Sequence, residues 1–183
     1  MRNIKAYYFD ELSKDVQKKV IDNFRYDKAY FLGDILNDNI QEDIENYWSE
    51  EFYLDLKNYD YSTYPYFFSI KNGKITDIEE FLKKFIMHNL EEGFKKEIEN
   101  FINDIYSIEI FKDEVYVYID NIDASEELKK KLAEEIQDFL KKYIYNEIVK
   151  MIKEEENYIF SDEFISEFLI INKYEFLENG IMV

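Results

Sequence analysis

The sequence predicts an α+β fold in which long amphipathic helices pack on short antiparallel hairpins. Apolar residues recur at helical spacing over several long segments, and short alternating segments lie between them. The chain of 183 residues contains only 4 glycines and 1 proline, so long irregular loops are not expected. These observations predict the element order β-α-α-ββ-α-ββ-α-α-ββ. No linker, repeat or low-complexity tract interrupts the chain, and we expect a single domain over residues 1–183.

The first predicted elements are a strand and two helices. Residues 3–9 are rich in aromatics and predict a strand. Ser13 is expected to cap a helix that ends near Tyr26. Residues 31–57 predict a long helix because apolar side chains recur on one of its faces. These side chains are Leu36, Ile40, Ile44, Tyr47, Trp48 and Phe52.

A hairpin is expected after the long helix. Pro65 bars a helix at its position, and residues 66–70 alternate weakly, which predicts a strand. Asn72-Gly73 is typical of a type I′ turn, since both central residues of that turn need positive φ. Residues 74–75 would then begin the return strand.

The next predicted elements are a helix and a strand pair. Thr76 and Glu79 form a capping box, which predicts the start of a helix whose apolar stripe continues to Ile102. Residues 107–111 and 114–119 are the clearest strand pair in the sequence, because apolar and polar residues alternate in the second of them.

Two helices and a last hairpin complete the expected fold. Asp123 or Ser125 is expected to cap a helix that runs to Glu156. Ser161 is expected to start a shorter helix, and the turn residues within 174–183 predict the hairpin.

Composition excludes several classes of function. Cys is absent, which rules out disulfides, thiol catalysis and thiolate metal sites. The formal charge of -18 should repel nucleic acid and anionic membrane, so we expect no direct binding to either. The sequence shows no signal-peptide core and no apolar stretch of membrane-spanning length. We therefore expect a cytoplasmic protein.

Motifs for catalysis, metals and cofactors are missing as well. His88 is the one histidine, and no Gly-x-Ser-x-Gly elbow or P-loop is present. The acidic turn at residues 120–123 lacks the spacing of an EF-hand. We expect no catalytic residue, no metal, no cofactor and no enzymatic activity. A hydrolase that uses a carboxylate pair stays open as a lesser hypothesis, because 41 acids are available.

Acidic residues concentrate in the predicted long helix. Residues 27–60 contain ten acids against two lysines, a local net charge of -8. Asp34, Asp38 and Glu42 lie four residues apart, which places them on one line at steps of about 6 Å. This spacing is close to the phosphate repeat of an extended nucleic acid strand. The segment is either a solvated face or a surface that imitates nucleic acid and docks on a basic groove.

Aromatic residues suggest a second surface. The chain contains 17 Tyr and 16 Phe, and Tyr59, Tyr61, Tyr64 and Tyr66 crowd around Pro65. Tyrosines beside carboxylates suit a protein interface. The expected partner-binding residues are Asp34, Asp38, Glu42, Asp43, Glu45, Trp48, Glu50, Glu51, Asp55, Tyr59, Tyr61 and Tyr64.

Both ends of the chain carry short recognisable segments. They are Tyr8-Phe9-Asp10-Glu11-Leu12-Ser13 near the start, and Asn172-Lys173-Tyr174-Glu175-Phe176 with Glu178-Asn179-Gly180 near the end. These segments resemble a loose group of small, mostly uncharacterised bacteriophage and prophage proteins. The resemblance covers roughly 45 terminal residues. It implies a shared frame and a phage origin, and it assigns no functional residue.

Two hypotheses follow for the function. The first is a phage-encoded, anti-CRISPR-like inhibitor, which would bind a basic groove of a host nucleic-acid-handling effector through the acidic helix. The second is a non-enzymatic phage accessory or assembly protein that self-associates, as a homodimer for instance, through the tyrosine-rich segment.

Overall fold

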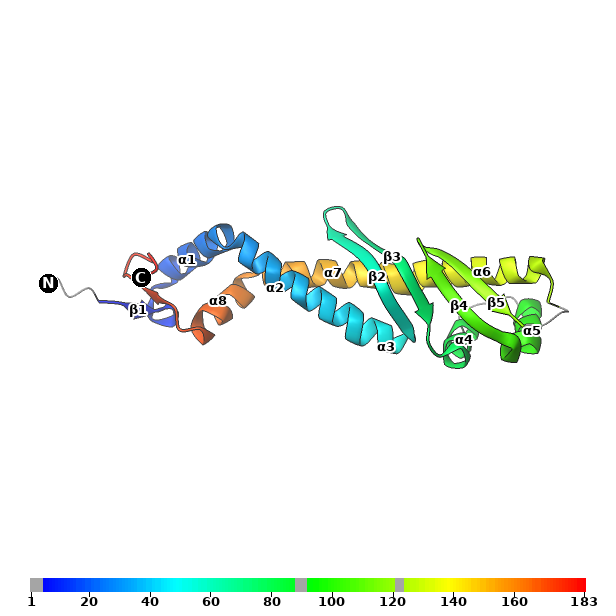
Figure 1. Cartoon of the computed structure of the whole chain (residues 1–183). Coiled ribbons are helices and arrows are strands. Elements are labelled where there is room, and N and C mark those ends of the chain that lie inside the picture. The colour runs from blue at the N-terminus through cyan, green and yellow to red at the C-terminus, as the bar shows by residue number, and fades with distance from the viewer. Residues whose placement is uncertain (1–4, 88–91, 121–123) are drawn as a thin grey trace. The chain divides into compact units, whose positions relative to one another are not determined.

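The computed structural model describes residues 5–87, 92–120 and 124–183 (Figure 1). Helices and antiparallel strands alternate along the chain, which confirms the α+β class and, roughly, the predicted order. The chain separates into two compact units, Met1–Ile40 with Glu154–Val183, and Gln41–Lys153. The unit boundaries fall inside two helices, α2 (Ala29–Glu42) and α7 (Asn146–Ile159). The single domain over residues 1–183 stays a prediction.

The first unit is mainly helical. Its remaining elements are β1 (Tyr7–Tyr8), α1 (Lys14–Asp27), α8 (Asp162–Ile171) and β6 (Glu175–Phe176). The two short strands pair antiparallel, with Tyr7 opposite Phe176. Aromatic rings fill the space between α1 and α8, since the Phe24 ring centroid lies 5.9 Å from Phe168 and 6.0 Å from Tyr174.

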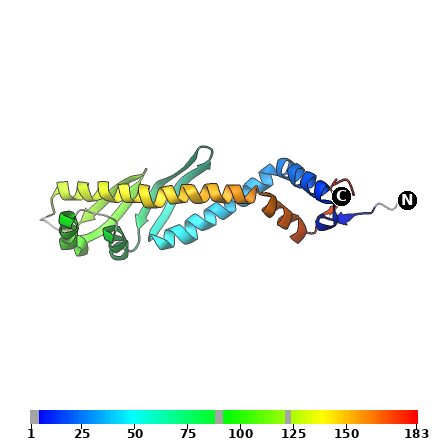
Figure 2. The same cartoon turned by 180° about the vertical axis from the view of Figure 1, so that it is seen from behind.

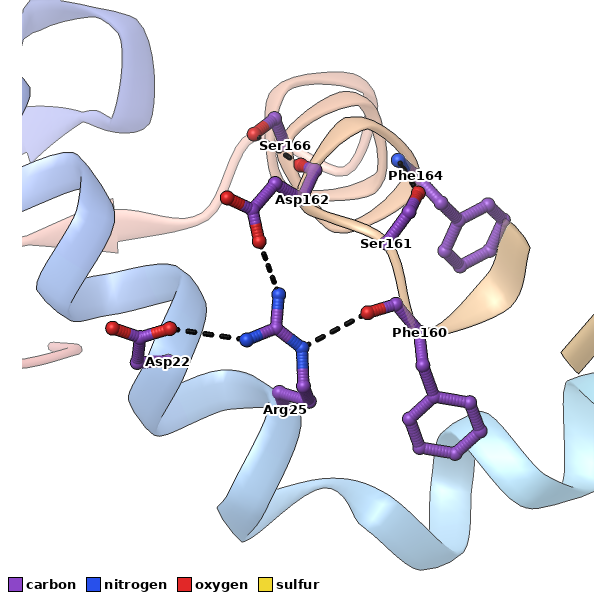
Figure 3. Close-up of polar contacts among 7 residues, drawn as sticks. All are labelled: Asp22, Arg25, Phe160, Ser161, Asp162, Phe164 and Ser166. Carbon is purple, nitrogen blue, oxygen red and sulfur yellow. Dashed lines mark hydrogen bonds and ion pairs between the residues drawn. The ribbon is translucent and has the colours of Figure 1, made fainter. Parts of the chain in front are cut away.

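Arg25 ties α1 to the start of α8 (Figure 3). Its Nε donates to the carbonyl oxygen of Phe160 at 2.9 Å, and its Nη1 donates to Asp22 at 3.0 Å. Its Nη2 pairs with the Asp162 carboxylate. The planar guanidinium therefore holds two segments that are 135 residues apart in sequence.

Replacing Arg25 by methionine is expected to lower the free energy of unfolding by about 1–2 kcal/mol, because charge-assisted hydrogen bonds are lost at a partly exposed site. Urea unfolding followed by circular dichroism measures the loss. Lys14→Met, which removes an exposed cation from the same helix, is the control. Equal effects of the two substitutions would show that the tie contributes nothing.

The second unit is a four-stranded antiparallel sheet with helices. Its strand order is β2-β3-β4-β5. The strands are β2 (Leu54–Thr63), β3 (Tyr66–Ile75), β4 (Ile105–Phe111) and β5 (Glu114–Ile119). The helices are α3 (Ser49–Glu51), α4 (Ile78–Met87), α5 (Glu92–Phe101) and α6 (Glu126–Leu140), with the first part of α7. Figures 1 and 2 show α6 running across one face of the sheet.

Phe139 of α6 is the centre of the aromatic core in this unit. Its ring centroid lies 6.4 Å from Phe52, 5.9 Å from Phe81, 5.6 Å from Phe85 and 5.3 Å from Tyr143. Edge-on and tilted pairs of this kind stabilise a core beyond the area they bury. Helix α4 and Phe52, which directly follows α3, are thus packed against α6.

The predicted caps Ser125 and Ser161 and one predicted hairpin are confirmed, whereas Ser13 lies at the N-cap of α1 without a side-chain cap hydrogen bond. Ser161 accepts a hydrogen bond from the N–H of Phe164 at 3.0 Å, and Ser125 accepts one from Leu128 at 3.1 Å. The alternative cap, Asp123, lies outside the described residues. Strands β4 and β5 pair as expected, and both residues of the Lys112-Asp113 turn have positive φ.

The predicted helix over residues 31–57 is wrong at its C-terminal end. Helix α2 continues through a π-helical segment, Asp43–Trp48, into α3, which ends at Glu51. Tyr53 then has φ 54°, a left-handed conformation that stops the helix. Leu54 lies opposite Ile75 in the sheet, so residues 54–57 are strand.

The predicted turn at Asn72-Gly73 is also wrong. Both residues lie inside β3, and the chain reverses between Thr63 and Tyr66. A Cβ at Gly73 would lie 3.2 Å from the carbonyl oxygen of Asp55. The glycine therefore permits close approach of β2 and β3 rather than a turn.

Other boundaries differ in detail. Asp77 caps α4, since its carboxylate accepts from the N–H of Glu80 at 3.1 Å, whereas Thr76 donates to the carbonyl oxygen of Tyr53. The helix predicted to reach Ile102 is described as α4 and α5, with residues 88–91 outside the description. Of the strand predicted at residues 3–9, the described part contains only the two residues of β1, followed by a 3₁₀ turn.

Candidate interaction surfaces

Helix α2 presents a polar line opposite its buried face. The buried positions of α2 are Leu32, Leu36 and Ile40. Asp34 and Asp38 are exposed, and Tyr30, one turn before Asp34, is 94% exposed. We name Tyr30, Asp34 and Asp38 the α2 stripe. Each residue of the stripe lies two positions from a buried residue of α2. Two positions correspond to a rotation of about 200° around the helix axis, so the side chains of the stripe point to solvent.

The acids of the α2 stripe are not used in internal ion pairs. Within the described residues, neither Asp34 nor Asp38 forms an ion pair or a side-chain hydrogen bond. Glu42 continues the same four-residue spacing at the last position of α2, and it is exposed as well. Like charges at this spacing cost helix stability, so the stripe is not explained by folding.

Several other predicted acids are engaged in the fold. Glu45 accepts a hydrogen bond from the Tyr59 hydroxyl at 3.1 Å. Glu51 forms an ion pair of 2.6 Å with Lys84, and Asp55 lies 4.0 Å from Lys74. Burial, and then the hydrogen bond and charge of the glutamate, raise the pKa of Tyr59 above its ordinary value. These acids are therefore less available for contact with a partner protein than Asp34 and Asp38.

The remaining predicted acids are Glu50 and Asp43. Glu50 is exposed and Asp43 is half-buried. Both lie in the second unit, on the π-helical segment and α3. The twelve predicted residues are therefore distributed over helix and strand, and they do not all lie on one helix face.

The predicted aromatic anchors are mostly packed. The Trp48 ring stacks on Phe52 with centroids 5.8 Å apart. Tyr59 and Tyr61 are half-buried and stack on each other at 6.4 Å. Tyr64, at the tip of the β2–β3 hairpin, is 93% exposed. Of these predicted anchors, Tyr64 is the one that faces solvent.

Tyr30 is the residue that sequence reasoning missed. It precedes Asp34 by four residues, so the helical spacing that selected the acids also selects it. A fully exposed tyrosine beside carboxylates is the composition of an interface anchor.

The sheet of the second unit leaves one face uncovered by α6. Four aromatics of β4 and β5 are exposed there, and we name them the open sheet face. They are Tyr106, Phe111, Tyr116 and Tyr118. Phe111, Tyr116 and Tyr118 line a depression of about 400 Å³, together with Lys57, Lys74 and Glu109. The Tyr116 hydroxyl donates to Glu114 at 2.8 Å.

Asp113, in the turn between β4 and β5, is half-buried and forms a polar network with β3 and Tyr145. Its carboxylate accepts from the N–H of Ile70 at 2.7 Å and from the Ser69 hydroxyl at 2.8 Å. It also forms a hydrogen bond with Tyr145, which is only 8% exposed. Burial, followed by the Asp113 charge, raises the pKa of Tyr145 above 10.0. Because this carboxylate accepts three hydrogen bonds, its role is to hold these segments together rather than to act as a catalytic base.

Tyr145→Phe is expected to change the alkaline stability of the protein. A raised pKa in the folded state stabilises the fold fully below about pH 10, and this contribution is lost as the pH rises above that value. Through this group, the free energy of unfolding of the wild type should fall by up to about 1.4 kcal/mol for each pH unit above that value. The stability gap between wild type and Tyr145→Phe should therefore narrow between pH 9 and 11 in urea unfolding. Tyr30→Phe is the exposed control, and a constant gap would contradict the account.

Sites for other chemistry are not found in the described part of the chain. Residues 5–87, 92–120 and 124–183 contain no group of three or more metal-ligating side chains. None of the helices described is long and apolar enough to cross a membrane. His88 lies outside the described residues.

Comparison with family models, curated proteins and solved structures finds no match to this chain.

Proposed function

We propose that this protein is a phage-encoded inhibitor of a host nucleic-acid-handling defence effector, similar in role to anti-CRISPR proteins. It acts in the host cytoplasm, without catalysis or cofactor, by placing the α2 stripe in a basic groove. The observation that supports this proposal best is the stripe itself: two exposed acids that form no ion pair or side-chain hydrogen bond within the described residues, beside a 94% exposed tyrosine.

The geometry of the stripe suits a groove built for phosphates. Residues four apart on a helix are about 6 Å apart along its axis. Lysines and arginines that normally contact successive phosphates can therefore meet Asp34 and Asp38 in turn. Glu42 extends the series by one step on the same helix.

Charge and anchoring have separate roles in the proposed complex. The formal charge of -18 speeds encounter with a basic surface and makes binding sensitive to salt. Tyr30 supplies apolar area and a hydroxyl at low entropic cost. The phage origin rests on the resemblance of the two chain ends, and the proposed target class rests on analogy with other small acidic phage proteins.

A pull-down from nuclease-treated bacterial lysate tests the proposal. The tagged protein is washed at low and at high salt, and retained proteins are identified by mass spectrometry. We expect a nucleic-acid-handling protein that is retained at low salt and lost at high salt. Recovery of the bait alone at both salt concentrations would contradict the proposal.

A second candidate is an accessory or assembly protein that acts by self-association. The open sheet face supports it, because four exposed aromatics on two adjacent strands form a candidate interface. The tyrosines near Pro65 support it less, since Tyr59 and Tyr61 pack within the second unit. Retention that is insensitive to salt, with the bait or a virion component as the partner, would favour this candidate.

A further inference from the structure

The two edge strands of the sheet differ in their protection against pairing. Strand β2 has register shifts around Asn58, and it carries Lys57 and Asp60 at its edge of the sheet. Such irregularities and charges hinder the addition of another strand. Strand β5 pairs with β4 without a shift from Glu114 to Tyr118, and it contains no lysine and no proline. Its sequence, EVYVYI, has high strand propensity.

A groove lies between β5 and α6. Its volume is about 270 Å³. Residues 115–118 of β5 line one side, and Glu126, Lys129, Lys130 and Ala133 of α6 line the other. Lys129 is paired with Glu126 at 2.8 Å, and Val115, Val117 and Ala133 supply aliphatic surface to the lining. An exposed sheet edge can accept an added strand.

We propose that a second copy of this chain pairs its own β5 antiparallel with this edge, which forms a two-fold dimer with a continuous sheet. The axis passes through Tyr116, so Tyr116 lies opposite Tyr116 of the second copy. Val115 then lies opposite Val117, and these residues of the second copy fill the groove. This dimer does not depend on the proposed function.

Hydrogen-bonding complementarity between two copies of β5 supports both the second copy as the occupant and this register. With Tyr116 on the axis, Glu114 lies opposite Tyr118 of the second copy. A tyrosine hydroxyl already pairs with this glutamate within the chain. An axis through Val117 would instead place Glu114 opposite Asp120, and like charges directly opposite destabilise a strand pair.

The dimer and the complex through the α2 stripe respond to salt in opposite ways. Each copy carries a formal charge of -18, so the copies repel at low salt. Salt screens this repulsion, so dimerisation should strengthen between about 50 and 500 mM salt, a range over which the Debye length falls from about 14 to 4 Å. Binding through the stripe should weaken over the same range.

A single-cysteine crosslink tests the register, because the natural chain has no cysteine. In the proposed dimer the two copies of residue 116 are directly opposite, with Cα atoms about 4.5–5.5 Å apart. This distance lies within the range of a disulfide. Tyr116→Cys should therefore give a covalent dimer on oxidation, while circular dichroism shows an unchanged fold.

Tyr118→Cys is the matched control. In this register the two copies of residue 118 are displaced by four positions, about 14 Å along the strands, which is too far for a disulfide. No crosslink in Tyr116→Cys, or equal crosslinking in both variants, would overturn the proposal. Neither outcome bears on the α2 stripe, so the two proposals fail separately.

Discussion

Reversing the charges at Asp34 and Asp38 to lysine is expected to weaken binding to the partner at least about 100-fold, which corresponds to about 2.8 kcal/mol. Two attractive contacts with basic groups become repulsive, and like charges at an interface cost several kcal/mol. Both residues are exposed and have no internal partner in the described structure, so the fold should not change. Affinity for the captured partner, measured by biolayer interferometry at fixed salt, gives the result.

The control for this change is the pair Glu134→Lys and Asp138→Lys. These acids lie four residues apart on α6 and are exposed, so the net charge changes by the same amount at the same helical spacing. A contact through the α2 stripe predicts at most a few-fold loss in the control. Equal losses in both double variants would show that only overall charge matters.

Replacing Phe139 by alanine is expected to lower the free energy of unfolding of the second unit by about 3–5 kcal/mol. Phe139 is buried, and its ring packs against Phe52, between α3 and β2, and against the α4 rings Phe81 and Phe85. Truncation leaves a cavity that these rings cannot all close. Urea unfolding followed by tyrosine and tryptophan fluorescence measures the change.

Phe111→Ala is the matched control, because the same atoms are removed from a ring that is 51% exposed on the open sheet face. We expect a loss below about 1 kcal/mol there. A small loss at Phe139, comparable to that at Phe111, would mean that α4 and α6 are not held by this aromatic cluster.

Local chemistry was the part of the fold that the sequence predicted well. The helix starting at Ser161 was predictable because one side chain satisfies an otherwise free backbone N–H. Strands β4 and β5 were predictable because alternation and a two-residue turn agree with each other.

The errors arose where a distant contact decides the local conformation. Asn72-Gly73 has the composition of a turn, but the pairing of β3 with both β2 and β4 keeps these residues in a strand. The end of the acidic helix depends on Tyr53, whose positive φ directs Leu54 into the sheet opposite Ile75. Neither pairing is visible in a local window of sequence.

The candidate site was predictable only in part. Helical spacing identified Asp34 and Asp38, and the structure shows that they are exposed. Spacing did not reveal that Glu51 would pair with Lys84, which is 33 residues further along the chain. Such tertiary pairs separate the acids that serve the fold from the acids that remain available to a partner.

Competition with nucleic acid tests the central claim most directly. A partner protein captured in the pull-down is loaded with a fluorescent oligonucleotide. The acidic 183-residue protein is then titrated into that complex while fluorescence anisotropy is recorded. We predict that wild type displaces the oligonucleotide and that the Asp34→Lys, Asp38→Lys variant does not. A ternary complex, in which protein and oligonucleotide bind together without loss of affinity, would contradict the claim that the α2 stripe occupies a nucleic-acid groove.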